Sequence, residues 1–216
     1  MNWPHALSIS RIVAGPVIVG LIVSSPGDAY LVAALLFGLA SATDLVDGRL
    51  ARHDRAAEAP LGIFLDTTAD KILVSLVLIG LSVAGLIALW IPLVIVGREF
   101  LISGLRSFAA SYGRVISARA WGKGKAALTM IAIFFLLVAA DGRIGGLGGI
   151  GSEGLWRTLF TLSGWLMVVA AVLTVISGLR YVLDAWPLLQ ESERAETVRI
   201  PRRRRRRDAV STASRK

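Results

Sequence analysis

Residues 44–70 read DLVDGRLARHDRAAEAPLGIFLDTTAD, and four of their aspartates stand at the junctions of strongly apolar segments (Asp44, Asp47, Asp66 and Asp70). A carboxylate placed deep in a membrane helix costs about 2.5–3.5 kcal/mol on insertion scales. A chain keeps four such groups close together only where something cationic offsets their charge. We therefore predict a metal site that opens to water at one face of a membrane.

The composition fits a membrane protein. Of the 216 residues, 55% are apolar, and the mean hydropathy of +0.66 is too high for an ordinary soluble domain. The chain has no cysteine, which excludes disulfides and thiolate zinc sites. The net charge of +9 includes an arginine run at residues 202–207, and no basic domain interleaved with aromatic residues accompanies it. We therefore expect no nucleic-acid partner and interpret the run as a basic tail near the membrane.

The apolar pattern predicts an all-α integral membrane protein with six transmembrane helices. Each segment is about as long as a bilayer crossing requires. The first contains Arg11 and Pro16, so its N-terminal part is expected at the interface, and it reads as a retained helix and not as a signal peptide. The membrane domain is expected over residues 1–186, followed by a disordered basic tail at 187–216. The six predicted spans are 7–23, 29–47, 62–80, 87–108, 121–140 and 156–181.

Positive charge predicts the orientation of these spans. Residues 49–55 and 106–125 together carry eight Lys and Arg. The connections at 24–28 and 81–86 carry none, and the glycine-rich connection 141–157 carries only Arg143 and Arg157. The positive-inside rule then places both termini and the aspartates on the cytoplasmic side of a multi-pass protein of the cell membrane.

Helical spacing brings the aspartates together in pairs. Asp44 and Asp47 are three residues apart, and Asp66 and Asp70 are four apart, so each pair shares one helix face. Four hard oxygen donors on two adjacent helices favour Mg²⁺ or Mn²⁺ over a soft metal. Helix capping would explain Asp44 and Asp47, but it fails for Asp70, which lies about 12 Å into its predicted helix at 1.5 Å per residue.

Small residues accompany the aspartates. Gly48 and Ala51 continue the face of Asp47, and Gly62 precedes Asp66 by one turn. Such residues leave room for a flat or phosphorylated ligand beside the metal. Simple close packing of helices accounts for them equally well, so both interpretations stay open.

A cationic set follows further along the chain. Arg98 falls in the middle of the fourth predicted span, Arg106 lies eight residues later, and Lys123 opens the fifth span. A lone arginine at that depth could pair with Glu99 or with an aspartate of the site. Because guanidinium groups bind phosphate oxygens in bidentate fashion, the set favours an anionic, phosphorylated second substrate.

The spacing of these residues resembles the signature of the CDP-alcohol phosphotransferases. The pattern is D-x-x-D-G-x-x-A-R, nine residues, then G-x-x-x-D-x-x-x-D, and its eight fixed positions all match from Asp44 to Asp70. The resemblance extends over roughly residues 2–183. Residues 4–11 (PHALSISR), 97–106 (GREFLISGLR) and 121–126 (WGKGKA) resemble the phosphatidylglycerophosphate synthase branch, although His5, Ser8 and Ala126 differ from its usual pattern.

The resemblance implies a six-helix membrane enzyme that is usually a homodimer. It implies CDP-diacylglycerol and sn-glycerol 3-phosphate as substrates, with CMP and phosphatidylglycerol phosphate as products. By position, Asp44, Asp47, Asp66 and Asp70 are expected to hold two divalent ions, Mg²⁺ or Mn²⁺, and Asp70 is the expected catalytic base. A CDP site is implied at Asp44, Asp47, Gly48, Ala51, Arg52, Gly62 and Asp66, and an acceptor-phosphate site at Arg98, Arg106 and Lys123.

Other functions compete with this expectation. The acceptor could instead be phosphatidylglycerol, as in a cardiolipin synthase, or inositol phosphate, and the cationic set disfavours neutral or zwitterionic acceptors such as serine. A divalent-cation channel or transporter would need a second acidic ring in the external halves of the spans, which the sequence lacks. A non-catalytic scaffold would leave the four aspartates unexplained.

Overall fold

The computed structural model describes residues 3–24, 29–50, 60–111, 121–146 and 151–213. All six predicted segments are helical, and the described residues contain no strand, so the all-α prediction is confirmed. The helices are α1 (Trp3–Ser24), α2 (Ala29–Leu50), α3 (Pro60–Val83), α4 (Trp90–Ser111), α5 (Trp121–Arg143) and α6 (Glu153–Ala213).

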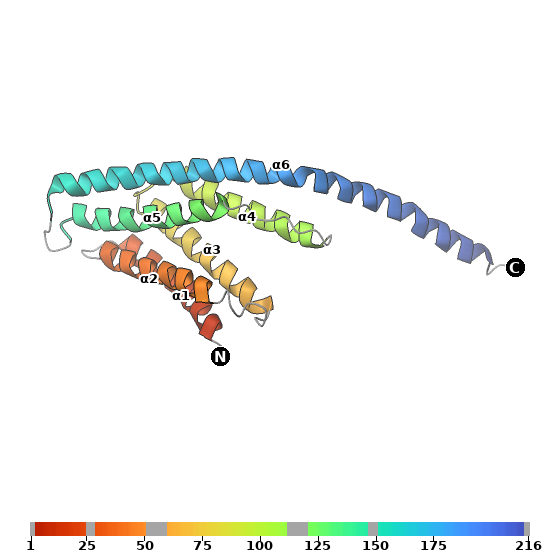
Figure 1. Cartoon of the computed structure of the whole chain (residues 1–216), viewed down its shortest axis with the longest axis horizontal. Coiled ribbons are helices and arrows are strands. Elements are labelled where there is room, and N and C mark those ends of the chain that lie inside the picture. Colours follow the sequence, from red (N-terminus) through yellow and green to blue (C-terminus); the bar gives the residue numbers. More distant parts are fainter. Residues whose placement is uncertain (1–2, 25–28, 51–59, 112–120, 147–150, 214–216) are drawn as a thin grey trace.

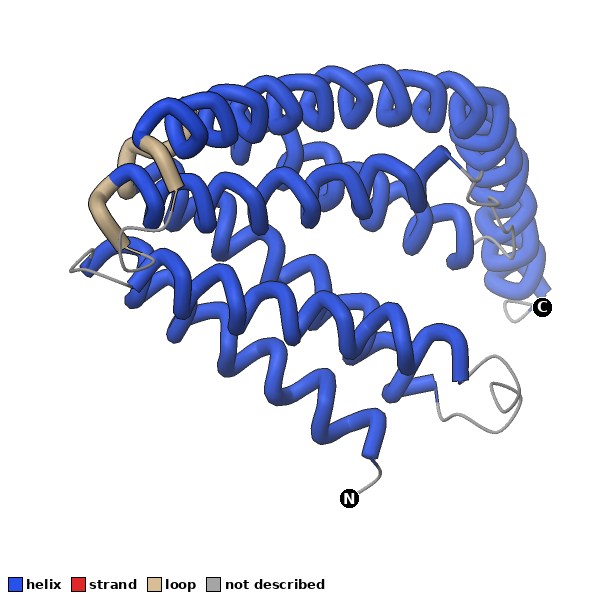
Figure 2. Tube along the Cα trace, turned by 60° about the vertical axis from the view of Figure 1, so that its left-hand side comes forward, coloured by secondary structure: helices blue, strands red, loops and turns tan. Residues whose placement is uncertain are grey.

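Successive helices run back and forth along one long axis (Figures 1 and 2). The start of α1, the end of α2 and the start of α3 therefore lie at one end of the bundle, together with the end of α4 and the start of α5. The opposite end holds the close of α1 and of α5 and the start of α2 and of α6. Every residue of the predicted site that the structure describes thus belongs to a helix that begins or ends at the first end.

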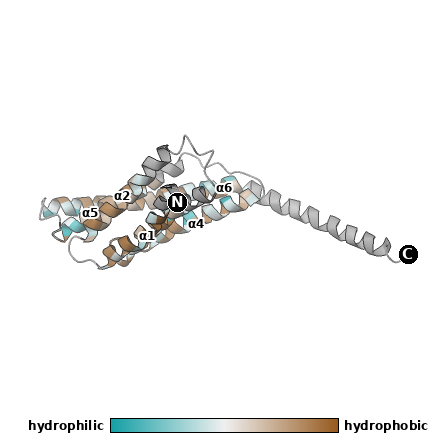
Figure 3. Cartoon of the chain, turned by 90° about the horizontal axis from the view of Figure 1, so that it is seen from below, coloured by the Kyte–Doolittle hydropathy of each residue, from teal (hydrophilic) through white to brown (hydrophobic). Residues whose placement is uncertain are grey.

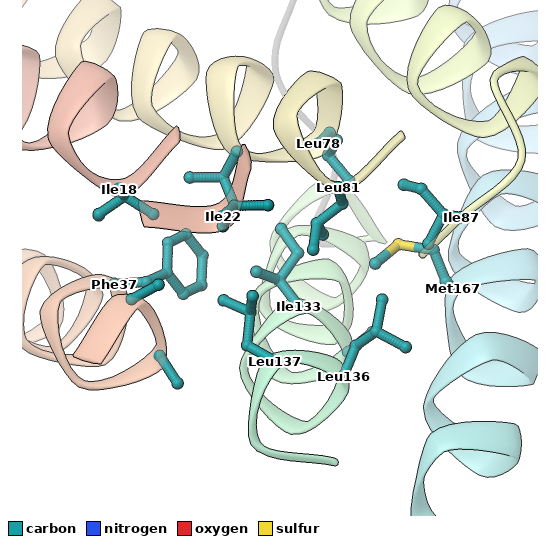
Figure 4. Close-up of a cluster of buried hydrophobic side chains, with 14 of the residues drawn as sticks. Ile18, Ile22, Phe37, Leu78, Leu81, Ile87, Ile133, Leu136, Leu137 and Met167 are labelled. Atoms are coloured by element: carbon teal, nitrogen blue, oxygen red, sulfur yellow. The ribbon is translucent and has the colours of Figure 1, made fainter. Parts of the chain in front are cut away.

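The helices pack in a chain of neighbours. α1 contacts both α3 and α2, α5 contacts α2 and α6, and α4 contacts α6 and, less extensively, α3. The core lies where these pairs meet, and Figure 4 shows Phe37 of α2 facing Ile22 of α1 and Leu137 of α5. Phe37 and Leu137 are almost fully buried, as expected of large apolar side chains in a close-packed interior.

The end of α5 is tied to the start of α2. Asp141 is completely buried, and its Oδ1 accepts a hydrogen bond of 3.0 Å from the backbone N–H of Leu31 in the first turn of α2. Its backbone carbonyl also accepts bonds from Ile144 and Gly146. Position 146 has no room for a side chain, because a Cβ there would lie 2.1 Å from Asp141 Oδ2. A carboxylate at a helix N-terminus satisfies an orphan N–H and interacts favourably with the helix dipole.

Apolar surface supports a membrane setting. Two helices are long and apolar enough to cross a bilayer within the described residues, over Ala126–Arg143 and Glu153–Trp186. Shorter apolar stretches run over Ser8–Ser24 and Ala29–Thr43. Figure 3 shows hydrophobic residues along much of α1, α2 and α5. Six complete crossings remain a prediction, because two helices meet the criterion of length and hydropathy within the described ranges.

The C-terminal segment differs from the expectation. We predicted disorder from residue 187 onward, whereas α6 continues as helix to Ala213. Arg, Ala, Glu and Leu are frequent in this segment and rank among the strong helix formers, so helix propensity persists after the apolar pattern ends. The disordered tail is therefore not confirmed.

Candidate active site

The signature aspartates lie on α2 and α3, Asp44, Asp47 and Asp66 near the helix ends and Asp70 further inside α3. Asp44, Asp47 and Gly48 lie in the last turns of α2, and Gly62 and Asp66 lie in the first turns of α3. The side chains of these five residues are not among those that the structure describes. Ala51 and Arg52 fall between the two helices and lie outside the described residues altogether.

Within the part of the chain that the structure describes, α1 is the main neighbour of α3. Among the described residues, α2 and α3 share no substantial direct contact, whereas α1 packs against both. A Cβ on Gly15 of α1 would lie 2.8 Å from Leu76 Cδ1, and a Cβ on Gly80 of α3 would lie 3.3 Å from Val19 Cγ2. These glycines bring α1 and α3 close together, side by side and in the same direction. Contact with α1 thus sets the position of α3 along the bundle axis, and with it the position of Asp70.

Asp70 is the signature aspartate whose side chain the structure describes, and it is half-buried. Its neighbour Lys71 is also half-buried, and Lys71 Nζ donates a hydrogen bond of 2.5 Å to Ser103 Oγ on α4. α3 and α4 make few other contacts, so this bond is a specific link between them. It places α4 beside the turn of α3 that carries Asp70.

Arg98 is held between α4 and α6. Its side chain is 15% exposed, and Nη1 forms an ion pair of 2.6 Å with Glu99 Oε1. Nη2 lies 3.4 Å from Ser177 Oγ of α6, and a Cβ on Gly178 would lie 2.9 Å from Arg98 Cγ. Pairing with Glu99 was one of the alternatives that the sequence left open, and this contact is present.

The other two predicted phosphate ligands lie on α4 and α5. Arg106 lies two turns beyond Arg98 on α4 and is exposed. Lys123 lies in the first turn of α5, and its side chain is outside the described residues. The common acceptor site predicted for Arg98, Arg106 and Lys123 therefore stays a prediction.

Sequence reasoning gave Arg11 no role in the site. The structure buries it to 2% exposure on α1, beside the equally buried Ser8. From the contacts of Gly15 with Leu73 and Leu76, Arg11 lies about level with the turn of α3 that contains Asp70. The signal was present in the sequence, because Arg11 is a lone cation inside an apolar span and closes the branch motif at residues 4–11.

The donor chemistry of the signature suits hard divalent ions. Four carboxylates on two helices supply the oxygen ligands that Mg²⁺ and Mn²⁺ prefer. The described residues form no group of three or more potential metal ligands. Three of the four aspartate side chains fall outside that part of the structure, so a metal centre is a proposal that rests on residue type and on the position of the helix ends.

Comparison with known proteins identifies the family. Residues 1–177 match the family described as CDP-alcohol phosphatidyltransferase. The chain belongs to this family. The CDP-alcohol phosphatidyltransferase match covers α1 to α5 and most of the apolar part of α6, and it ends at Ser177, beside the contact with Arg98.

Curated members of the family are similar over most of the chain. A protein of Pseudomonas fluorescens is 32% identical over 203 residues, covering 91% of this chain and 96% of its own length. Proteins of Bacillus subtilis (34% identity, 88% of this chain, 98% of their own) and Rickettsia bellii (36%, 83% and 93%) are similar to comparable degrees. All three are named CDP-diacylglycerol–glycerol-3-phosphate 3-phosphatidyltransferase.

Proposed function

We propose that this protein transfers the phosphatidyl group of CDP-diacylglycerol to sn-glycerol 3-phosphate, forming phosphatidylglycerol phosphate and releasing CMP. The observation that carries the proposal is the complete signature from Asp44 to Asp70 in the sequence, and the position of its aspartates on α2 and α3 supports it. The names and near full-length coverage of the relatives support the choice of substrates.

The aspartates are proposed to hold two divalent ions, Mg²⁺ or Mn²⁺. Asp44, Asp47 and Asp66 would contribute to both the ions and the nucleotide site, and Asp70 would complete the set. When bound, such ions neutralise charge on the diphosphate and on the departing CMP. Gly48, Ala51, Arg52 and Gly62 are proposed to line the CDP site.

The remaining steps fall to side chains of the chain itself. Arg98, Arg106 and Lys123 would bind the phosphate of the acceptor and orient its 1-hydroxyl. Asp70 would take the proton from that hydroxyl as its oxygen attacks the phosphorus of the phosphatidyl group. The bond between this phosphorus and the oxygen bridging to CMP then breaks, and CMP leaves with the electron pair.

The membrane setting follows from the substrates and from the apolar helices. We propose six crossings with both termini and the site on the cytoplasmic side, which lets the acyl chains stay in the bilayer while the headgroup meets a soluble acceptor. Exposed apolar side chains such as Leu39, Phe100 and Trp165 are suited to contact lipid. The functional unit is proposed to be a homodimer.

The test is CMP release by purified protein in detergent with Mg²⁺ or Mn²⁺. Release should require both CDP-diacylglycerol and sn-glycerol 3-phosphate, and a chelator should stop it. Asp70→Asn should abolish release, whereas Asp54→Asn, which changes an aspartate of the same stretch outside the signature, should retain it.

An acceptor panel completes the experiment. Phosphatidylglycerol, inositol phosphate and serine should each support CMP release at least tenfold less well than glycerol 3-phosphate. Full activity of Asp70→Asn would remove the base assignment, and a better acceptor in the panel would replace the proposed substrate.

A further inference from the structure

α1 carries one buried cation close to the proposed site. Arg11 is 2% exposed, and α1 contains no Asp or Glu over its whole length from Trp3 to Ser24. A guanidinium group stays protonated in proteins, so burial of Arg11 requires a partner that compensates its charge. That partner is expected to be a carboxylate on another helix, because α1 itself supplies none.

The helices that pack against α1 offer few carboxylates. Among the described residues, α1 packs chiefly against α2 and α3. The acidic residues of these two helices are the four signature aspartates and no others, namely Asp44 and Asp47 on α2 and Asp66 and Asp70 on α3. A carboxylate partner of Arg11 on either helix is therefore an aspartate of the proposed metal site.

Helix register selects Asp70 among these four. α1 and α3 lie side by side in the same direction, and a Cβ on Gly15 would stand 3.9 Å from Leu73 Cα. Arg11 precedes Gly15 by four residues, and Asp70 precedes Leu73 by three, so each shares a helix face with the residue that follows it. Arg11 and Asp70 therefore lie on the facing sides of α1 and α3, both about one turn before this close approach.

The cation next to Asp70 in the sequence is directed toward another helix. Lys71 Nζ donates a hydrogen bond of 2.5 Å to Ser103 Oγ on α4. Consecutive residues of an α-helix point about 100° apart, so Lys71 faces α4 from a different side of α3 than Asp70 does. Asp70 is half-buried, so its charge also favours a nearby cation, and Arg11 is the cation that α1 brings to this face.

We propose that Arg11 forms an ion pair with Asp70 across the interface of α1 and α3, and that this pair orients the carboxylate of the catalytic base. Arg11 is then a positioning residue, since it acts through Asp70 and touches no substrate. The positioning role rests on the proposed function, whereas the ion pair itself does not. A guanidinium fork fixes the direction of a carboxylate more closely than a single ammonium group does.

Thermal unfolding of the full chain in detergent tests the ion pair without any assay of activity. Arg11→Met keeps an apolar stem and removes the charge, which leaves a partly buried carboxylate uncompensated, so Tm should fall by about 6–12 °C. Asp70→Asn removes the charge of that carboxylate. The double variant should therefore lose at least about 3 °C less than the sum of the two single losses.

Two matched variants on α6 serve as controls. Arg157→Met removes an exposed arginine whose ion pair with Glu153 is also exposed, so it should change Tm by less than about 3 °C. Asp184→Asn neutralises an exposed aspartate, and its effect should add to that of Arg11→Met without coupling.

Arg11→Lys separates pairing from packing. Lysine keeps the charge and loses the fork, so this variant should recover at least half of the Tm that Arg11→Met loses. A residue needed only to fill space would be replaced by methionine as well as by lysine, and equal losses in the two variants would overturn the proposal. Should Arg11→Met fail to fold, the cycle of Arg11→Lys with Asp70→Asn takes its place, and its losses should again be less than additive.

CMP release measures the positioning role. Arg11→Lys should lower kcat about ten- to hundredfold, because the base is displaced, while the KM for each substrate stays within about threefold of the wild-type value. Strictly additive Tm losses for Arg11→Met and Asp70→Asn would overturn the ion pair, and an unchanged kcat in Arg11→Lys would overturn the positioning role. Wild-type protein that releases no CMP would refute the proposed function and with it the positioning role, whereas the unfolding cycle still decides the ion pair.

Discussion

Replacement of Asp141 tests whether its hydrogen bond to Leu31, which joins the end of α5 to the start of α2, stabilises the fold. Asp141→Ala removes a fully buried carboxylate whose Oδ1 accepts from Leu31 N–H at 3.0 Å. A hydrogen bond to a charged group contributes about 1.5–3 kcal/mol, and a carboxylate at a helix N-terminus adds about 0.3–1 kcal/mol through the helix dipole. The two contributions overlap, so we expect a loss of about 2–3 kcal/mol in the free energy of unfolding.

Thermal unfolding in detergent measures this loss. In a chain of 150–250 residues, 1 kcal/mol corresponds to about 2–4 °C in Tm, so Asp141→Ala should lower Tm by about 4–12 °C. Asp141→Asn keeps an oxygen acceptor but loses the charge, and its decrease should be about half as large. Glu153→Ala is the matched control at the same end, because its ion pair with Arg157 is exposed and should contribute less than about 1 kcal/mol. A Tm for Asp141→Ala within 1 °C of the wild type would show that this hydrogen bond does not stabilise the fold.

Two further predictions concern the packing of α3. Gly15→Ala should lower Tm by several degrees, because the added Cβ would lie 2.8 Å from Leu76 Cδ1. Gly20→Ala is the control on the same helix, and it should be neutral or slightly stabilising because no atom lies within 4 Å of its added Cβ. Equal Tm values for the two variants would contradict the close approach of α1 and α3. The hydrogen bond between Lys71 and Ser103 can be tested by a double-mutant cycle of Lys71→Met, Ser103→Ala and the double variant. The losses in the free energy of unfolding should show a coupling of about 0.5–1.5 kcal/mol between the two positions. Strictly additive losses would show that this bond contributes nothing to stability.

The helices could be predicted from the sequence because their signal is local. A run of apolar residues ended by charge or glycine marks each span, and each of the six observed helices overlaps the segment predicted for it. The exception is α6, whose predicted end at 181 followed hydropathy alone. Helix formation depends on backbone propensity as well, and the arginine-rich segment keeps that propensity after its hydropathy falls.

Contacts between distant segments could not be predicted in the same way. Asp141 belonged to a connection interpreted only as a glycine-rich linker, and its partner Leu31 lies 110 residues away. The residues next to Asp141 and Leu31 in the sequence give no indication that the two form a hydrogen bond. Gly178 is equally ordinary in sequence, since a glycine near the end of an apolar helix is common. Its role becomes visible through Arg98, which the packing of α4 on α6 brings against it.

The signature itself was the easiest feature to recognise, yet the arrangement around it changes how it is understood. We expected α2 and α3 to be adjacent, and among the described residues α1 packs against both of them. The position of α3 along the bundle axis therefore depends on α1, through Gly15 and Gly80. A metal site tolerates displacements of only a few tenths of an ångström in its ligands, so a substitution in the interface of α1 with α3 should weaken metal activation without touching an aspartate. For this reason Gly15→Ala, assayed for CMP release over a range of Mn²⁺ concentrations, should require more metal for half-maximal rate than Gly20→Ala. An identical metal requirement in the two variants would show that α1 has no part in placing the aspartates.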